Sequence, residues 1–213
     1  MSRQRKTDNG RLLGTVEEVA RAWGVKRRLD RALLLGRAYQ KCLDCTVEVS
    51  GRSKVQAGAA NTRLGKIMLN AALLEPGREA DRNATFLHEC AHILADSVYR
   101  RNCQHGPYWK RVMELLGENP DVHHDLEYLS PKAQAVATWV CRACGEEYHY
   151  VRKPRHRPQD CYCARCGPRR GRLEAIEMPP RINLDPPPAF DSRTEIGVNA
   201  YQPAKKKAAK SKG

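Results

Sequence analysis

Apolar side chains recur at three- and four-residue intervals in the first 120 residues, and this period predicts α-helices. Four stretches show it, at residues 15–24, 26–39, 78–98 and 105–117. The first opens with Thr15-Val16-Glu17-Glu18, a capping-box sequence that marks a helix start. In the second, four positions are expected to face inward: Leu29, Ala32, Leu33 and Gly36.

Between the second and third helices, three short segments alternate or carry β-branched residues and therefore predict strands. They are residues 45–50, 56–60 and 66–70. Turn residues separate them closely, so we expect an antiparallel meander. The small side chains of the middle segment would let an extended substrate approach its backbone. The predicted fold class is α+β: a small antiparallel three-stranded sheet packed with helices.

Composition divides the 213 residues into four parts. We expect a mobile basic N-terminus at residues 1–14 and a folded domain at 15–139. A cysteine-rich module should follow at 140–175, and a Pro-rich linker with a disordered Lys-rich tail at 176–213. The formal net charge of +14 favours a polyanionic partner, of which nucleic acid is the commonest.

The start of the chain is basic but lacks the apolar segment of a signal peptide, and no run of about 18 apolar residues follows. We therefore expect a soluble cytoplasmic protein with no membrane partner, associated with the nucleoid if DNA is bound. Nine cysteines in such a chain indicate metal binding rather than disulfides.

One motif in the third predicted helix carries chemistry. In His88-Glu89-Cys90-Ala91-His92, two histidines four residues apart lie on one helix face and can ligate one metal ion. Glu89 lies beside that face, where it can act as general base on a zinc-bound water. Cys90 points off the face, and we expect it to be a buried packing residue. The motif alone also fits an ordinary amphipathic helix, so its interpretation depends on residues further along.

A catalytic zinc site needs a third protein ligand and one open position. We expect this ligand to be His105, because it follows a loop and Gly106 lets the backbone turn closely. His123 and His124 compete for the role, and Glu114 is a further candidate. Stabilisation of the oxyanion also needs a donor. The eligible side chains are Tyr99, Tyr108, His123, His124 and Tyr128.

Two Cys-x-x-Cys-Gly sequences predict a second, structural zinc ion. Eighteen residues separate them, a spacing within the range of four-cysteine zinc ribbons. The four ligands are Cys141, Cys144, Cys163 and Cys166. Cys161 is an alternative to Cys163, which we prefer because only Cys163 repeats the knuckle. Cys42 and Cys45 have the same spacing but no second half, and we interpret them as ordinary packing residues.

The cysteine-rich module is strongly basic. Residues 141–173 hold nine Lys and Arg against three acids, whereas residues 75–128 hold ten acids against six Lys and Arg. Aromatic rings among these cations suit single-stranded DNA, which is bound by stacking and phosphate contacts. The expected contacts are Tyr148, Tyr150, Arg152, Lys153, Arg155 and Arg157. The alternative is a solvated surface, with the aromatics in the module's own small core.

Together these residues resemble the SprT-like family of zinc metallopeptidases, which includes the Spartan branch. The resemblance runs from about Val47 to Gly167 and covers the strands, the His-Glu-x-x-His helix, His105-Gly106-Pro107-Tyr108-Trp109 and both knuckles in order. It implies a zincin-like fold with zinc on His88, His92 and His105, Glu89 as catalytic residue, and a C-terminal zinc ribbon. The Spartan branch acts in DNA repair, where it cleaves proteins crosslinked to DNA. The chain looks like a short bacterial relative.

The function predicted is that of a zinc metalloendopeptidase with one catalytic and one structural Zn²⁺. Its expected partners are protein substrates and single-stranded DNA, with DNA-bound or DNA-crosslinked proteins as the substrates. The alternative is a zinc-stabilised nucleic-acid-binding or regulatory protein whose peptidase site is idle. A Glu89→Gln variant separates the two, because only the first loses its function.

Overall fold

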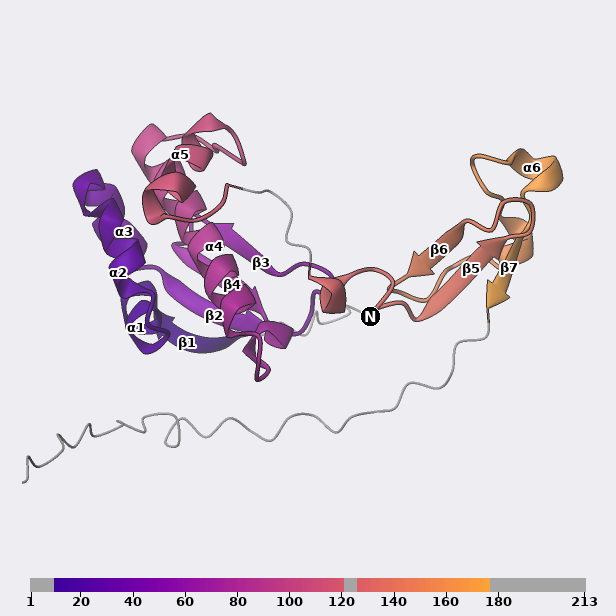
Figure 1. Cartoon of the computed structure of the whole chain (residues 1–213), viewed down its shortest axis with the longest axis horizontal. Coiled ribbons are helices and arrows are strands. Elements are labelled where there is room, and N and C mark those ends of the chain that lie inside the picture. Colours follow the sequence, from indigo (N-terminus) through magenta and orange to yellow (C-terminus); the bar gives the residue numbers. More distant parts are fainter. Residues whose placement is uncertain (1–9, 121–125, 177–213) are drawn as a thin grey trace, which may run out of the picture. The chain divides into compact units, whose positions relative to one another are not determined.

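The computed structural model describes residues 10–120 and 126–176, which form two β-sheets, each with its own hydrophobic core (Figure 1). The predicted Lys-rich tail and the first nine residues lie outside the described residues, as do His123 and His124. Each described helix is too short or too polar to span a bilayer. The predicted α+β class is confirmed.

The first sheet has four strands in the order β1-β2-β4-β3. Their bounds are β1 Arg11–Thr15, β2 Thr46–Ser50, β3 Gly58–Asn61 and β4 Lys66–Asn70. β1 is antiparallel to β2 and β3 is antiparallel to β4, but β2 and β4 are parallel. The predicted antiparallel three-stranded meander is therefore wrong. The connection at residues 51–57 carries the chain past one strand position, so that β4 returns between β2 and β3, and β3 becomes an edge strand.

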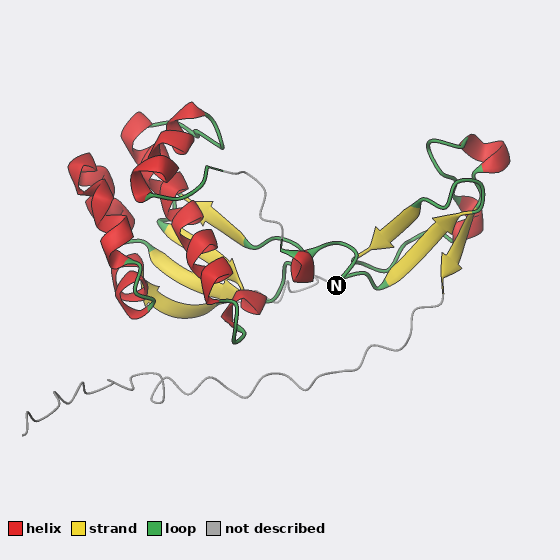
Figure 2. Cartoon of the chain, in the orientation of Figure 1, coloured by secondary structure: helices red, strands yellow, loops and turns green. Residues whose placement is uncertain are grey.

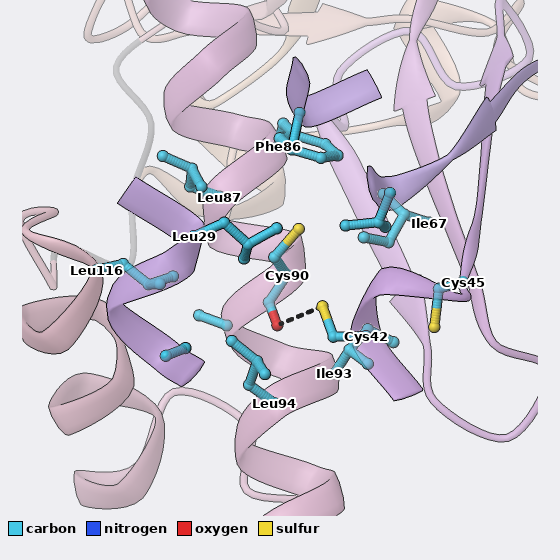
Figure 3. Packing of buried hydrophobic residues seen from close by; sticks show 14 of the residues in the cluster. Leu29, Cys42, Cys45, Ile67, Phe86, Leu87, Cys90, Ile93, Leu94 and Leu116 are labelled. Atoms are coloured by element: carbon cyan, nitrogen blue, oxygen red, sulfur yellow. Dashed lines mark hydrogen bonds between the residues drawn. The ribbon is translucent and has the colours of Figure 1, made fainter. Parts of the chain in front are cut away.

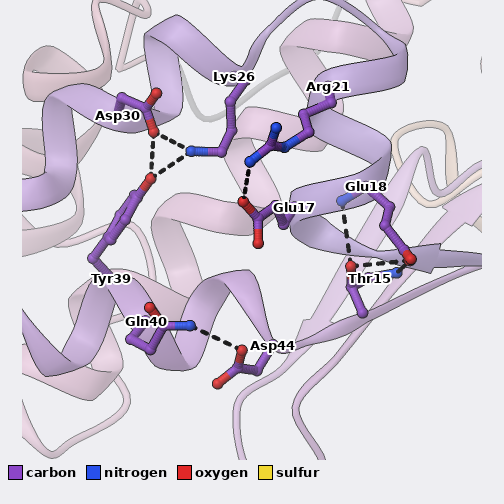
Figure 4. Close-up of polar contacts among 9 residues, drawn as sticks. All are labelled: Thr15, Glu17, Glu18, Arg21, Lys26, Asp30, Tyr39, Gln40 and Asp44. Carbon is purple, nitrogen blue, oxygen red and sulfur yellow. Dashed lines mark hydrogen bonds and ion pairs between the residues drawn. The ribbon is translucent and has the colours of Figure 1, made fainter.

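β1 also corrects the predicted mobile N-terminus, because residues 11–14 pair with β2. The sequence did not predict this strand, because it is short, its neighbours in the chain are polar, and it is ordered by pairing with β2. β1 leads directly into α1 (Val16–Ala22), and the predicted capping box is confirmed. The Glu18 backbone N–H donates to the Thr15 hydroxyl at 3.3 Å, and the Thr15 N–H donates to the Glu18 carboxylate at 2.7 Å (Figure 4).

The predicted helix at residues 26–39 is broken into three pieces. They are α2 (Lys26–Leu29), the 3₁₀ helix η1 (Asp30–Leu35) and α3 (Arg37–Leu43). Gly36, with φ of 54°, makes the break. Because a 3₁₀ helix has a period of three, the inward positions change: Leu29 and Ala32 are buried as predicted, but Leu33 is 60% exposed. Asp30 accepts hydrogen bonds from Lys26 and Tyr39, which links the pieces (Figure 4).

The helices cover one face of the four-stranded sheet (Figure 2). On β2 and β4 the residues facing them, such as Val47, Val49 and Ile67, are buried, and the alternate residues apart from Asn70 are partly exposed. The long helix α4 (Glu79–Tyr99) runs through the centre of this layer, preceded by the 3₁₀ helix η2 (Ala71–Leu74). Its Phe86, Leu87 and other buried side chains pack against residues of the sheet and the earlier helices (Figure 3).

α5 (Pro107–Leu116) lies within the helix predicted at residues 105–117 and ends at Gly117, which has φ of 77°. Four side chains on its inner face are buried: Trp109, Val112, Met113 and Leu116. A further 3₁₀ turn, η3 (Glu127–Leu129), contacts the start of α4, because the Tyr128 hydroxyl donates to Asp81 at 2.9 Å.

The second sheet is antiparallel, with the order β6-β5-β7. Its strands are β5 Ala137–Cys141, β6 Glu147–Tyr150 and β7 Leu173–Ile176, joined through the short helices η4 (Pro158–Asp160) and α6 (Gly167–Arg170). The core beneath it contains only Trp139, Leu173 and two cysteines as fully buried residues. So small a core makes an additional crosslink necessary for a stable fold.

Candidate metal centres

Three histidines from two parts of the chain converge on one point. His88 and His92 lie one turn apart on α4, and His105 lies two residues before α5. The Nε2 atoms are 3.1 Å apart for His88 and His105, 3.2 Å for His92 and His105, and 3.3 Å for His88 and His92. Ligand atoms about 2.0–2.1 Å from a tetrahedral zinc ion are about 3.3 Å from one another. The spacing therefore fits one zinc ion.

The indole ring of Trp109 packs against all three histidines. Its centroid lies 4.7 Å from those of His88 and His105 and 5.4 Å from that of His92. Burial, with His105 as a neighbour, lowers the pKa of His92 to about 4, so its imidazole is neutral and can ligate a metal at pH 7. The sequence alone assigned Trp109 no role at this site. Its spacing of four from His105 is the one sequence signal of this contact.

Glu89 lies beside the histidines and is only 5% exposed. Burial raises the pKa of its carboxyl to about 8, and a hydrogen bond from the backbone of Ala60 on β3 opposes this rise. A cation on the neighbouring histidines would also lower this pKa, because it favours the charged carboxylate. A carboxyl group with a raised pKa at a cleft is a suitable proton acceptor and donor near neutral pH.

The edge strand β3 passes directly over Glu89. A Cβ atom added to Gly58 would lie 2.7 Å from Oε1 of Glu89 and 2.9 Å from Cγ2 of Thr85, well inside van der Waals contact. Glycine is thus required here for close approach of the strand to the helix. The small residues noted in the sequence serve this contact, in addition to leaving room at the strand edge.

A cleft of about 1010 Å³ contains the three histidines and Glu89. One wall is residues 56–63, which include β3, and the other is α4 with residues 100–102 and 104 of the loop that follows. The cleft is thus bordered by an exposed sheet edge on one side and by the loop that leads to His105 on the other.

Several candidates from the sequence lie elsewhere. Glu114 is exposed on α5 and does not line the cleft. The rings of Tyr99 and Tyr108 contact each other with their centroids 3.8 Å apart, and the Tyr128 hydroxyl donates to Asp81. None of these three tyrosines lines the cleft. His123 and His124 lie outside the described residues. Among the described residues, His105 alone joins His88 and His92 in a potential metal-binding group.

The second cluster joins four cysteines: Cys141, Cys144, Cys163 and Cys166. The Sγ atoms of Cys144 and Cys163 are 3.8 Å apart, and two sulfurs about 2.3 Å from a tetrahedral zinc ion are about 3.8 Å apart. All nine cysteines are free of disulfides. A hydrogen bond from Arg165 is the main cause that lowers the pKa of Cys144 to about 6, which favours the thiolate that zinc requires.

The two knuckles have matching backbones. The Gly145 N–H donates to the Cys141 carbonyl and the Gly167 N–H to the Cys163 carbonyl, both at 2.9 Å, and both glycines have φ of 71°. This repeat includes Cys163, whereas Cys161 lies outside the group of four and packs against the small core. Cys42, Cys45 and Cys90 are buried in the first core, where Cys42 donates to the Cys90 carbonyl at 3.9 Å (Figure 3).

The six predicted DNA-contact residues fall into two groups. Arg152, Lys153, Arg155 and Arg157 are exposed, and within the described residues none of them takes part in an ion pair. Tyr148 and Tyr150 are half-buried instead, and the Tyr150 ring lies 4.5 Å from that of Trp139. The exposed aromatic ring of this module is Tyr162, which is 56% exposed.

The fold and these clusters define a class: an α+β protein with two candidate metal sites, one of three histidines and one of four cysteines. A family model described as the SprT-like family matches residues 28–128. This match and the relatives described next support the predicted resemblance: residues 28–128 of this chain are similar to the SprT-like family.

The relatives include bacterial proteins named Protein SprT. That of Vibrio atlanticus is 34% identical over 90 residues, which is 42% of this chain and 52% of the relative. That of Pasteurella multocida is 29% identical over 135 residues, 62% of this chain and 79% of the relative. That of Vibrio parahaemolyticus is 34% identical over 86 residues, 40% and 50% respectively. The chain thus spans about half the length of the two Vibrio relatives.

Proposed function

We propose that the protein is a zinc-dependent endopeptidase that acts on proteins bound or crosslinked to DNA. The observation that carries the proposal is the convergence of three Nε2 atoms within 3.3 Å of one another, beside a buried carboxyl group in an open cleft. The three imidazoles would hold the zinc ion. When bound, zinc supplies Lewis-acid activation of a water molecule and of the peptide carbonyl.

Glu89 would move the protons. Its carboxylate accepts one from the attacking water and returns it to the nitrogen of the leaving amine, so that the proton count balances. Burial raises the pKa of this carboxyl group to about 8, close to neutral pH. The backbone N–H of Ala60 donates a hydrogen bond to the carboxyl group and holds it in position. Gly58 allows the strand and the carboxylate to lie this close.

The edge strand β3 offers a binding mode for the substrate. It has one hydrogen-bonded neighbour, β4, and its other edge borders the cleft. An extended peptide can add to such an edge through main-chain hydrogen bonds, with little dependence on its sequence. A protease that removes diverse proteins from DNA requires this tolerance. Three arginines also line the cleft (Arg63, Arg100 and Arg101), which favours acidic side chains in the substrate.

The basic module would bring the enzyme to its substrates. Exposed cations such as Arg152 and Arg155 suit phosphate contacts, and the exposed ring of Tyr162 is available for stacking on an unpaired base. A zinc ion on the four cysteines would hold this module folded.

The test is incubation of the zinc-loaded full chain with a DNA-binding protein, with and without single-stranded DNA. The wild type should cleave the protein, faster with DNA present. Glu89→Gln should retain zinc and DNA binding but lose cleavage. If the wild type cleaves nothing under either condition, while Glu89→Gln preserves its DNA binding, the alternative of a nucleic-acid-binding protein with an idle site gains the support instead.

A further inference from the structure

One carboxylate connects both walls of the cleft to the metal helix. Asp96 lies on α4, one turn after His92, and lines the cleft. Its Oδ1 accepts a hydrogen bond of 2.8 Å from the backbone N–H of Cys103, two residues before His105. Its Oδ2 accepts one of 2.9 Å from the hydroxyl of Thr62, in the turn between β3 and β4. The loop of the third histidine and the end of the substrate strand are thus fixed to the same side chain.

The loop before His105 needs such a connection. Arg100 and Gln104 are the non-glycine residues with positive φ in the described chain, at 52° and 44°. A positive φ is unfavourable for an L-residue. It persists only where surrounding contacts over-determine it. Inside the loop the Gln104 N–H donates to Asn102, but the bond from Cys103 to Asp96 is the one that leads back to α4 beside the ligands.

We propose that Asp96 is a positioning residue of the metal centre, which holds His105 at ligating distance from His88 and His92. It acts through the loop and is not itself a ligand, since both carboxylate oxygens receive other donors. Through Thr62 it also keeps the β3 edge in register with the metal. This inference rests on the proposed binding of a metal by the three histidines.

The experiment measures zinc affinity in the full chain by competition with a chromogenic chelator. Removal of a group that orients a metal ligand typically weakens metal binding about 10–100-fold. We expect this loss at the three-histidine site in Asp96→Ala, and no change at the four-cysteine site of the same molecules. Asp96→Asn should retain most of the affinity, because its amide oxygen still accepts from Cys103 and its NH₂ donates to Thr62.

The matched control is Asp81→Ala. Asp81 also lies on α4 and also accepts a tertiary hydrogen bond, from Tyr128, but at the opposite end of the helix. This variant should bind zinc as the wild type does. Cobalt substitution gives a second readout, because the visible spectrum of Co²⁺ on imidazoles should change in Asp96→Ala and stay unchanged in Asp81→Ala. If Asp96→Ala does not fold, Asp96→Glu, which displaces the carboxylate by one methylene, replaces it under the same expectation.

Wild-type zinc affinity in Asp96→Ala would overturn the inference. So would an equal loss in Asp81→Ala, which indicates general loosening of α4, or an equal loss in Asp96→Asn, which indicates an effect of charge rather than of the two hydrogen bonds. A wild type that binds zinc at the four cysteines alone contradicts the proposed function itself, so the two failures are distinguishable.

Discussion

Replacement of Gly58 by alanine tests the contact between β3 and the proposed general base. The added Cβ would lie 2.7 Å from Oε1 and 2.9 Å from Cγ of Glu89, and 2.9 Å from Cγ2 of Thr85. Ordinary contacts of such atoms are about 3.5–4.0 Å, so the strand or the carboxylate must move by close to 1 Å. Thr85 and Glu89 are buried beneath β3, so the edge strand or the Glu89 carboxylate must be displaced at the cleft.

Overpacking of this kind costs about 1–3 kcal/mol of stability. For a domain of this size that lowers the melting temperature by roughly 3–10 °C. A displacement of about 1 Å at a reacting group can cost on the order of 100-fold in rate. We therefore expect a larger fractional loss of cleavage than of folded protein at 25 °C, with zinc content preserved, because the atoms nearest the added Cβ belong to Glu89 and Thr85 and not to the three histidines.

The matched control is Gly51→Ala. Gly51 also lies near a strand end of the same sheet, but nothing lies within 4 Å of its added Cβ and its φ is not positive. It should melt and cleave like the wild type. The assays are thermal unfolding followed by circular dichroism and cleavage of a DNA-binding protein. If Gly58→Ala cleaved at the wild-type rate, the close contact between β3 and Glu89 would not be needed for cleavage, and this prediction would be refuted.

Two further predictions concern charge. Substitution of Arg155 and Arg157 by glutamine should weaken single-stranded DNA binding and reduce the slope of log affinity against log salt concentration by about 0.7 for each lost phosphate contact, as fluorescence anisotropy in a salt series can measure. The control is Arg142→Gln, which removes a cation that already pairs with Glu174 and should change the slope less. Burial alone raises the pKa of Asp30, but hydrogen bonds from Lys26 and Tyr39 outweigh it and hold this pKa below its usual value. The free energy of unfolding of the wild type should therefore exceed that of Asp30→Asn above about pH 4, and this difference should disappear as the pH falls further. A difference that grew on acidification would contradict the prediction.

Local patterns in the sequence predicted what local forces decide. The capping box at Thr15 and the helix predicted at residues 105–117 depend on neighbouring residues in the chain, and both are confirmed. The four-residue spacing of His88 and His92 puts both on one face of α4, and the structure brings His105 to them. The repeat of the knuckle sequence selected Cys163 over Cys161 for the same reason, since each knuckle is a local turn.

Features decided by distant residues were missed or wrong. The parallel pairing of β2 with β4 depends on where the chain returns after residues 51–57, and no period in the sequence encodes that path. The break at Gly36 overrode an apolar period that fits a continuous helix. Asp96 gave no signal either, because its partners, Thr62 and Cys103, lie on other elements.

The central claim is that two helical histidines and one from a loop hold a zinc ion, separately from the four cysteines. Elemental analysis of full chain purified without added metal, for wild type and for His105→Ala, tests it most directly. We expect about two zinc ions per chain in the wild type and about one in His105→Ala, whose remaining zinc stays on the cysteines and whose cleavage activity is lost. Two zinc ions retained in His105→Ala, or a single one in both proteins, would contradict it.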